Sequence, residues 1–145
     1  MVDDSTTPLE QFEARFSIDG PHTSEDLAAA AGILAAAVRY LNHATLPHRA
    51  SESIPFPGTG SKIVSTLAGA VAGLGQLTEQ LGQRFTAFAD DENVYDDGMG
   101  TKLEGAAPAR ARLAARHLTD ASNRAYLVVE DLDEAFSQTN RLGYR

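Results

Sequence analysis

The stretch DDENVYDDGMGTKLEG (residues 90–105) carries the side chains that come closest to forming a metal site in this sequence. Its carboxylates are the oxygen ligands that Ca²⁺ prefers. Aligned to the EF-hand calcium loop, Gly98 takes the sharp-turn position and Glu104 the bidentate one. The first and third ligand positions are Asn93 and Tyr95, which removes two carboxylates. We therefore expect a charged connector, with ordering against a basic protein surface as the open alternative.

The stretch PGTGSK (57–62) resembles the end of a phosphate-binding P-loop, with Lys62 close to the start of a helix. A P-loop needs Gly and Lys to be adjacent, with Ser or Thr next, and it follows a strand. Here Ser61 separates Gly from Lys62, Ile63 comes next, and no strand is expected before it. The segment therefore predicts a turn, with Thr59 or Ser61 capping the following helix.

The histidines do not form a recognisable ligand set. They are His22, His43, His48 and His117. No Glu-x-x-His or His-x-x-x-His pair is present, so helical di-iron and zincin sites lack their minimum ligands. His43 and His48 flank a turn and could share a metal ion, but no third ligand is identifiable. We expect no metal, no cofactor and no catalytic residue.

A basic cluster stands out near the start of the last predicted helix. It consists of Arg110, Arg112, Arg116 and Arg124. Asp120 lies four residues from both Arg116 and Arg124, a spacing that favours a ladder of surface ion pairs. The alternative is a docking surface for an acidic partner or for the acidic loop of a second copy.

Composition narrows the possible partners. The 145 residues carry a net charge of −8 and include no Cys, which excludes disulfides and thiolate chemistry. An acidic chain is poorly suited to neutralise phosphates, so we do not expect it to bind nucleic acid or anionic membranes. The start is acidic and does not resemble a secretory signal. The longest uncharged stretches, 27–38 and 63–78, are shorter than a membrane span requires. We expect a cytoplasmic protein.

Helical periodicity and capping signals cover most of the chain. TPLE (7–10) predicts a capping box and a short helix to about Phe16, and TSED (23–26) predicts the start of a helix over 24–44. Two further long helices are expected over about 61–89 and 108–140. Each long helix has an apolar stripe in steps of three and four. These stripes contain Leu27, Ala31, Leu34, Val38, Leu41 and Thr45; Ile63, Leu67, Ala70, Leu74, Leu77 and Leu81; and Ala114, Leu118, Ala121, Ala125, Val128, Leu132, Ala135 and Thr139.

These elements predict an all-α fold, an antiparallel bundle of three long helices plus a short N-terminal helix. We expect a single domain over 1–145, with 1–7 disordered and connecting loops at 46–60 and 90–107. Four glycines lie in the helix expected over 61–89, and they favour close packing against a neighbouring helix over a kink. They are Gly69, Gly73, Gly75 and Gly82.

The stretch AAAVRYLNHAT (35–45), followed by LGQLTEQLGQ and a closing AFSQTNRLGY, resembles helical proteins of high-GC actinobacteria. Those proteins are uncharacterised and look like products of plasmid, integrative-element or phage-associated genes. The resemblance covers roughly 24–144 and implies no activity, so no functional residues are transferred from it. The long turn at 46–62 and the acidic stretch depart from the family pattern.

We therefore expect a non-enzymatic helical interaction or oligomerisation module, assembling with itself or with another protein. Tyr40, Asn42 and His43 lie in the last turns of the second helix, where the Asn42 amide adjoins the apolar stripe and is expected to hydrogen-bond to a neighbouring helix or loop. They join the four arginines as candidate interaction residues. One alternative is a small-ligand or enzymatic site around Arg39, Tyr40 and His43. Another is a DNA-associated accessory protein that uses the arginines of the last helix.

Overall fold

The computed structural model of the chain describes residues 6–96 and 106–143, and within this part all regular structure is helical, without a strand. The predicted all-α class is confirmed. The described chain divides into two compact units, residues 1–55 and 56–145. The expectation of a single domain stays a prediction, and each unit is taken separately below.

The first unit contains α1 (Pro8–Arg15), α2 (Ser24–Ala44) and α3 (Ala50–Ser53). The predicted capping box is present: the Glu10 carboxylate accepts from the Thr7 backbone N–H at 2.6 Å, and Thr7 Oγ1 accepts from Glu10 N–H at 3.3 Å. The short α3 lies in the predicted loop and was not expected. Ser53 on α3 donates to the Ala44 carbonyl oxygen at 2.7 Å, which fastens this turn to the end of α2.

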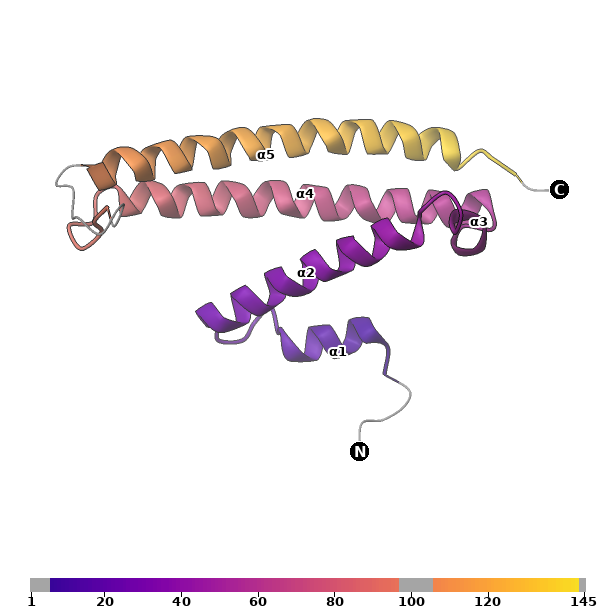
Figure 1. Cartoon of the computed structure of the whole chain (residues 1–145), viewed down its shortest axis with the longest axis horizontal. Helices are drawn as coiled ribbons and strands as arrows, with labels where there is room; N and C mark the ends of the chain where they lie inside the picture. The colour runs from indigo at the N-terminus through magenta and orange to yellow at the C-terminus, as the bar shows by residue number, and fades with distance from the viewer. Residues whose placement is uncertain (1–5, 97–105, 144–145) are drawn as a thin grey trace. The chain divides into compact units, whose positions relative to one another are not determined.

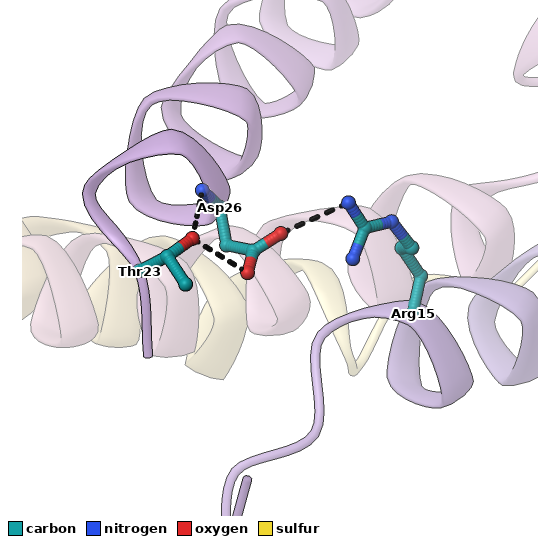
Figure 2. A network of polar contacts seen from close by, with 3 residues as sticks. All are labelled: Arg15, Thr23 and Asp26. Atoms are coloured by element: carbon teal, nitrogen blue, oxygen red, sulfur yellow. Dashed lines mark hydrogen bonds and ion pairs between the residues drawn. The ribbon is translucent and has the colours of Figure 1, made fainter. Parts of the chain in front are cut away.

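A polar network joins α1 to the start of α2 (Figure 2). Thr23 is the N-cap of α2, and its Oγ1 accepts from the Asp26 N–H at 3.0 Å and donates to the Asp26 carboxylate at 2.8 Å. Arg15 reaches the other carboxylate oxygen of Asp26 at 2.9 Å. The predicted start of α2 is confirmed, because the cap satisfies one of its free N–H groups.

The second unit is a hairpin of two long helices, α4 (Pro57–Phe88) and α5 (Ala106–Thr139), which run side by side in opposite directions (Figure 1). Of the three long helices, the antiparallel packing is shown for this pair. The helix α4 begins four residues earlier than expected, with Pro57 at its first position and Phe56 as the N-cap residue, whose side chain makes no capping hydrogen bond. PGTGSK is therefore the first turn and a half of a helix, and neither Thr59 nor Ser61 caps it.

Small residues form the seam between α4 and α5. On α4 they recur every seven residues as Ser61, Ala68, Gly75, Gly82 and Ala89, all of which are buried. The buried residues of α5 are Ala107, Ala111, Ala115 and Ser122. A seven-residue repeat keeps one narrow stripe of each helix against the other, as in a left-handed coiled coil.

Two of the four glycines account for how close the backbones come. A Cβ added to Gly82 would lie 3.3 Å from the Ala115 carbonyl oxygen, and one added to Gly75 would lie 3.3 Å from the Ala125 Cβ. Close packing, as expected, occurs at these positions. The same addition at Gly69 or Gly73 would meet no described atom within 4 Å, so these two glycines do not contribute to it.

The seam differs from the stripe expected for α4. Leu67, Leu74 and Leu81 each precede a buried seam residue by one position, so they lie beside the seam instead of within it. Leu77 and Leu81 are 44% and 41% exposed. Both stripes have the same step pattern, and the one with smaller residues forms the seam because it allows the helix axes to come closer.

Replacing Gly82 by Leu tests the close approach. We expect a loss of about 1–3 kcal/mol in the free energy of unfolding, because the side chain would overlap the α5 backbone. The matched control, Gly73→Leu, should raise stability by up to about 1 kcal/mol, since it replaces a helical glycine in open space. Urea unfolding followed by circular dichroism measures both. Equal effects at the two positions would contradict this seam.

The capping box predicts a pH dependence for α1. The hydrogen bond from the Thr7 backbone N–H, with that from its hydroxyl, lowers the pKa of Glu10 below its ordinary 4.5. A carboxylate with a depressed folded pKa stabilises the helix above its unfolded pKa, and this contribution is lost as the pH falls through the folded pKa. An NMR titration of the Glu10 carboxyl should give a lower pKa in buffer than in denaturing urea. Thr7→Ala keeps the backbone N–H and loses the hydroxyl, so this variant should remove only part of the difference between the two pKa values.

Candidate interaction surfaces

One side of the hairpin is apolar from end to end, and we call it the hairpin face. On α4 it is formed by Leu67, Leu74, Leu81 and Phe88, and on α5 by Ala114, Ala121, Val128 and Ala135. The four α4 residues each precede a buried residue of the seam by one, as Ala114 and Ala121 do on α5, and Val128 and Ala135 continue the same seven-residue spacing. This puts the two rows on the same side of an antiparallel pair. A cavity of about 290 Å³ lined by Phe88 and Ala114 brings the two rows together at one end.

The hairpin face is only partly covered in the described structure. Val128 is 45% exposed, Leu81 remains exposed, and Leu67 and Leu74 are half-buried. An apolar surface that is continuous over several turns of two helices marks an interaction site more often than a solvated surface. The sequence alone does not predict the hairpin face as an exposed surface, because a stripe of leucines with this spacing is expected to pack inside a helical bundle.

The charges of α5 change sign along its length. Residues 106–124 carry Arg110, Arg112, Arg116 and Arg124, with Asp120 among them. The remainder of α5 carries Glu130, Asp131, Asp133 and Glu134. The predicted basic cluster is therefore one end of a helix whose other end is equally acidic.

Two of the four arginines are paired with the acidic stretch. Arg112 contacts Asp90 at 3.2 Å in an exposed ion pair, and Arg110 contacts Asp96, whose side chain is buried. The described part of the acidic stretch thus lies against the basic start of α5 in the same chain, one of the arrangements left open by the sequence. The calcium-loop positions Gly98 and Glu104 lie outside the described residues.

The expected ladder of ion pairs further along α5 is not observed. Arg116, Asp120 and Arg124 are exposed, and no salt bridge joins them within the described part of the chain. These two arginines therefore remain available to a partner. No group of three His, Asp or Glu side chains among residues 6–96 and 106–143 is placed to hold a metal ion.

The end of α2 brings together some of the expected residues. Tyr40 and His43 line an open cavity of about 320 Å³ with Arg49, Glu52 and Ser53, the last two from α3. Arg39, expected in the alternative ligand site, does not line this cavity. The Asn42 side chain is exposed, and no hydrogen bond from its amide to a neighbouring helix is found in the described structure. The backbone carbonyl oxygen of Asn42 accepts a hydrogen bond of 3.5 Å from Thr45 Oγ1.

A second cavity in the first unit lies between α1 and the start of α2. It measures about 520 Å³ and is lined by Phe16, Ile18, Leu27 and Ala30, with Arg15 and Asp26 at its polar side. Because Arg15 and Asp26 are paired with each other, the cavity offers a ligand mainly apolar surface. Sequence reasoning missed it, since the turn that forms it has no periodic pattern.

The helix α2 buries none of its residues in the described structure. Leu27, Leu34 and Val38, from its predicted stripe, are 64%, 39% and 46% exposed. By length and composition alone this helix, near the N-terminus, is apolar enough to cross a membrane, with a mean hydropathy of 1.2. Helices that form the core of a soluble assembly satisfy the same two criteria.

Comparison of the chain with protein-family models, with curated proteins and with solved structures found no match in any of the three. The surfaces described above are therefore the basis for the function proposed below.

The buried Asp96–Arg110 pair predicts unequal roles for two neighbouring arginines. Arg110→Gln should cost about 1–3 kcal/mol, because it leaves the buried carboxylate without its cation. The control, Arg112→Gln, should change stability by less than about 0.5 kcal/mol, since its partner is exposed. Urea unfolding measures both. Similar losses for the two variants would show that the Asp96 pair does not hold the acidic stretch against α5.

Proposed function

We propose that this protein is a non-enzymatic module for helical protein assembly, acting as a homo-oligomer or with a second helical protein. The observation that carries the proposal is the hairpin face. Large apolar side chains line α4, and Val128 with three alanines lines α5, beside a seam of small residues; Leu81 and Val128 are 41% and 45% exposed. Covering such a surface with another apolar helix face gains about 25 cal/mol per Å² removed from water.

The proposal includes the antiparallel bundle of three long helices with the short α1 added to it. The third long helix would be α2, whose apolar stripe has no cover of its own within the first unit. The connection from the end of α2 to the start of α4 spans residues 45–56 and includes α3. The outer row of α4 is also apolar, with Ile63 half-buried and Ala70 and Leu77 exposed.

The proposal further includes a cytoplasmic protein that acts without a cofactor, a nucleic-acid partner or a membrane, and the net charge of −8 supports the absence of nucleic acid and anionic membranes among its partners. The chain is acidic overall, and two of the four arginines of α5 are already paired with Asp90 and Asp96. This leaves Arg116 and Arg124 for phosphates, too few for the DNA-associated role considered above. The resemblance of the helices to proteins of mobile genetic elements adds a setting to the proposal, but no activity.

A small-ligand site is the second candidate, and the cavity of Tyr40, His43, Arg49 and Glu52 is the observation that favours it. It is open and has both a cation and a carboxylate at its rim. The assembly surface is the stronger basis for a function, because it extends over two long helices where the cavity involves a few side chains.

Size-exclusion chromatography with light scattering tests the assembly proposal on the full chain. We expect a mass of twice the chain or more at tens of micromolar, because exposed apolar helix faces associate. Mixing the chain with neutral and anionic lipid vesicles, followed by sedimentation, should leave it in the supernatant. A monomer that sediments with vesicles would overturn the proposal in favour of a membrane role for α2. A monomer strongly stabilised by a nucleotide, phosphate or divalent ion would overturn it in favour of a ligand site.

A further inference from the structure

We infer that the hairpin face is covered by the hairpin of a second copy, in a symmetric four-helix arrangement. Its two-fold axis lies in the interface between the copies and passes beside α5 at the level of Val128. This inference rests on the proposed assembly function and names its partner and register. The axis is perpendicular to the helices, so that α5 lies antiparallel to the partner's α5 and α4 antiparallel to the partner's α4.

The charge pattern of α5 favours a second copy over an unrelated partner. The charged residues that adjoin the hairpin face beside Val128 are Arg124 and Asp131, which repel their own kind in a parallel pair and attract each other in an antiparallel one. A helix with this pattern is complementary to itself. A two-fold symmetric interface requires this property, because the same surface is used on both copies.

The positions of individual side chains around Val128 define the register. Arg124 lies four residues before Val128 and Asp131 three residues after it, so both adjoin Val128 on one side of the helix. Rotation about an axis through Val128 places Arg124 opposite the partner's Asp131, and Asp131 opposite the partner's Arg124. The arrangement therefore contains two equivalent ion pairs around one apolar contact of Val128 with itself.

The apolar row of α5 agrees with the same axis. Ala121 and Ala135 lie seven residues on either side of Val128. Ala121 would face the partner's Ala135, and Ala135 would face the partner's Ala121. Alanines at these positions allow two helices to approach closely. This row contains no charged side chain, so the interface would bury no charge from it.

The row of leucines on α4 provides an independent check. The contacts of Gly75 with Ser122 and Ala125 place Val71, one turn earlier on α4, level with Val128 on α5. Leu67 and Leu74 lie four residues before and three residues after Val71. The axis derived from α5 therefore also places Leu67 opposite the partner's Leu74. One symmetry operation satisfies both helices, although the two rows were chosen by different chemistry.

The available surface is large enough for a stable dimer. The hairpin is about 45 Å long, from the rise of 1.5 Å per residue, and two helices wide, about 20 Å. With the axis at Val128, residues 117–139 of α5 and 57–85 of α4 overlap with the partner. This overlap buries roughly 700 Å² per copy, close to the ~800 Å² of a standard specific interface.

Charge reversal at the two pairing positions tests the register. Arg124→Asp alone and Asp131→Arg alone each create two like-charge contacts in a symmetric dimer, and each should weaken it by about tenfold or more. An equimolar mixture of the two variants should recover a heterodimer of nearly the original affinity, because every contact is again between opposite charges. Sedimentation equilibrium measures these constants, and circular dichroism confirms that each variant is helical.

Matched controls use the same exchanges away from the hairpin face. Arg116→Asp lies four residues from Asp120, as Arg124→Asp does, so it has the same effect within the helix. Asp133→Arg repeats the second exchange two positions from Asp131 and on another side of α5. Neither should weaken the dimer by more than about threefold, the range of an exposed ion pair.

A single cysteine tests the axis directly, because the chain has none of its own. Val128→Cys should form an intermolecular disulfide on mild oxidation, since the two copies of residue 128 meet at the axis. Asn123→Cys, exposed on the other side of α5, should not.

The outcomes separate this inference from the proposed function. A dimer that survives both charge reversals, or that cross-links at residue 123 and not at 128, overturns this register and leaves the assembly function standing. A chain that stays monomeric at tens of micromolar, with no cross-link at residue 128, overturns the inference. The full pattern of weakening, rescue in the mixture and cross-linking at 128 supports it.

Discussion

The close approach of the α4 and α5 backbones is the constraint on which the rest of the second unit depends. At Gly82 the backbones of the two helices are so near that one added methyl group would touch the Ala115 carbonyl oxygen. Such a distance can be kept over several turns only if the seam residues are small, and the buried ones are Ala, Gly and Ser in both helices. Large apolar side chains are excluded from the seam by their volume.

This exclusion explains why the hairpin face exists. The leucines of α4 have the spacing of core residues, but in the hairpin they lie beside the seam and keep part of their surface in water. A seam of small residues buries little apolar area, so the hairpin gains little of the hydrophobic stabilisation that the leucines could provide. In the proposed assembly, a partner's apolar face would recover this stabilisation. The geometry that shapes the hairpin would then also supply the proposed interaction surface.

Electrostatics act at the ends of the hairpin and along α5 in different ways. At the connecting end, the buried Asp96 side chain contacts Arg110, which holds the described part of the acidic stretch, 90–96, against α5. Further along, Arg124 and Asp131 are exposed and contribute little to the stability of one chain. In the proposed dimer they would select a partner of opposite charge order, because like charges across an interface are costly.

The sequence alone determined the helical class, the capping box at Thr7, the start of α2 at Ser24 and the basic start of α5, because these depend on neighbours within a turn or two along the chain. The sequence alone could not decide which stripe of α4 forms the seam. The stripe of Leu67 and the stripe of Ala68 have the same period and differ by one residue, about 100° around the helix. Only packing against α5 separates them, since the distance between two backbones is a property of both helices together.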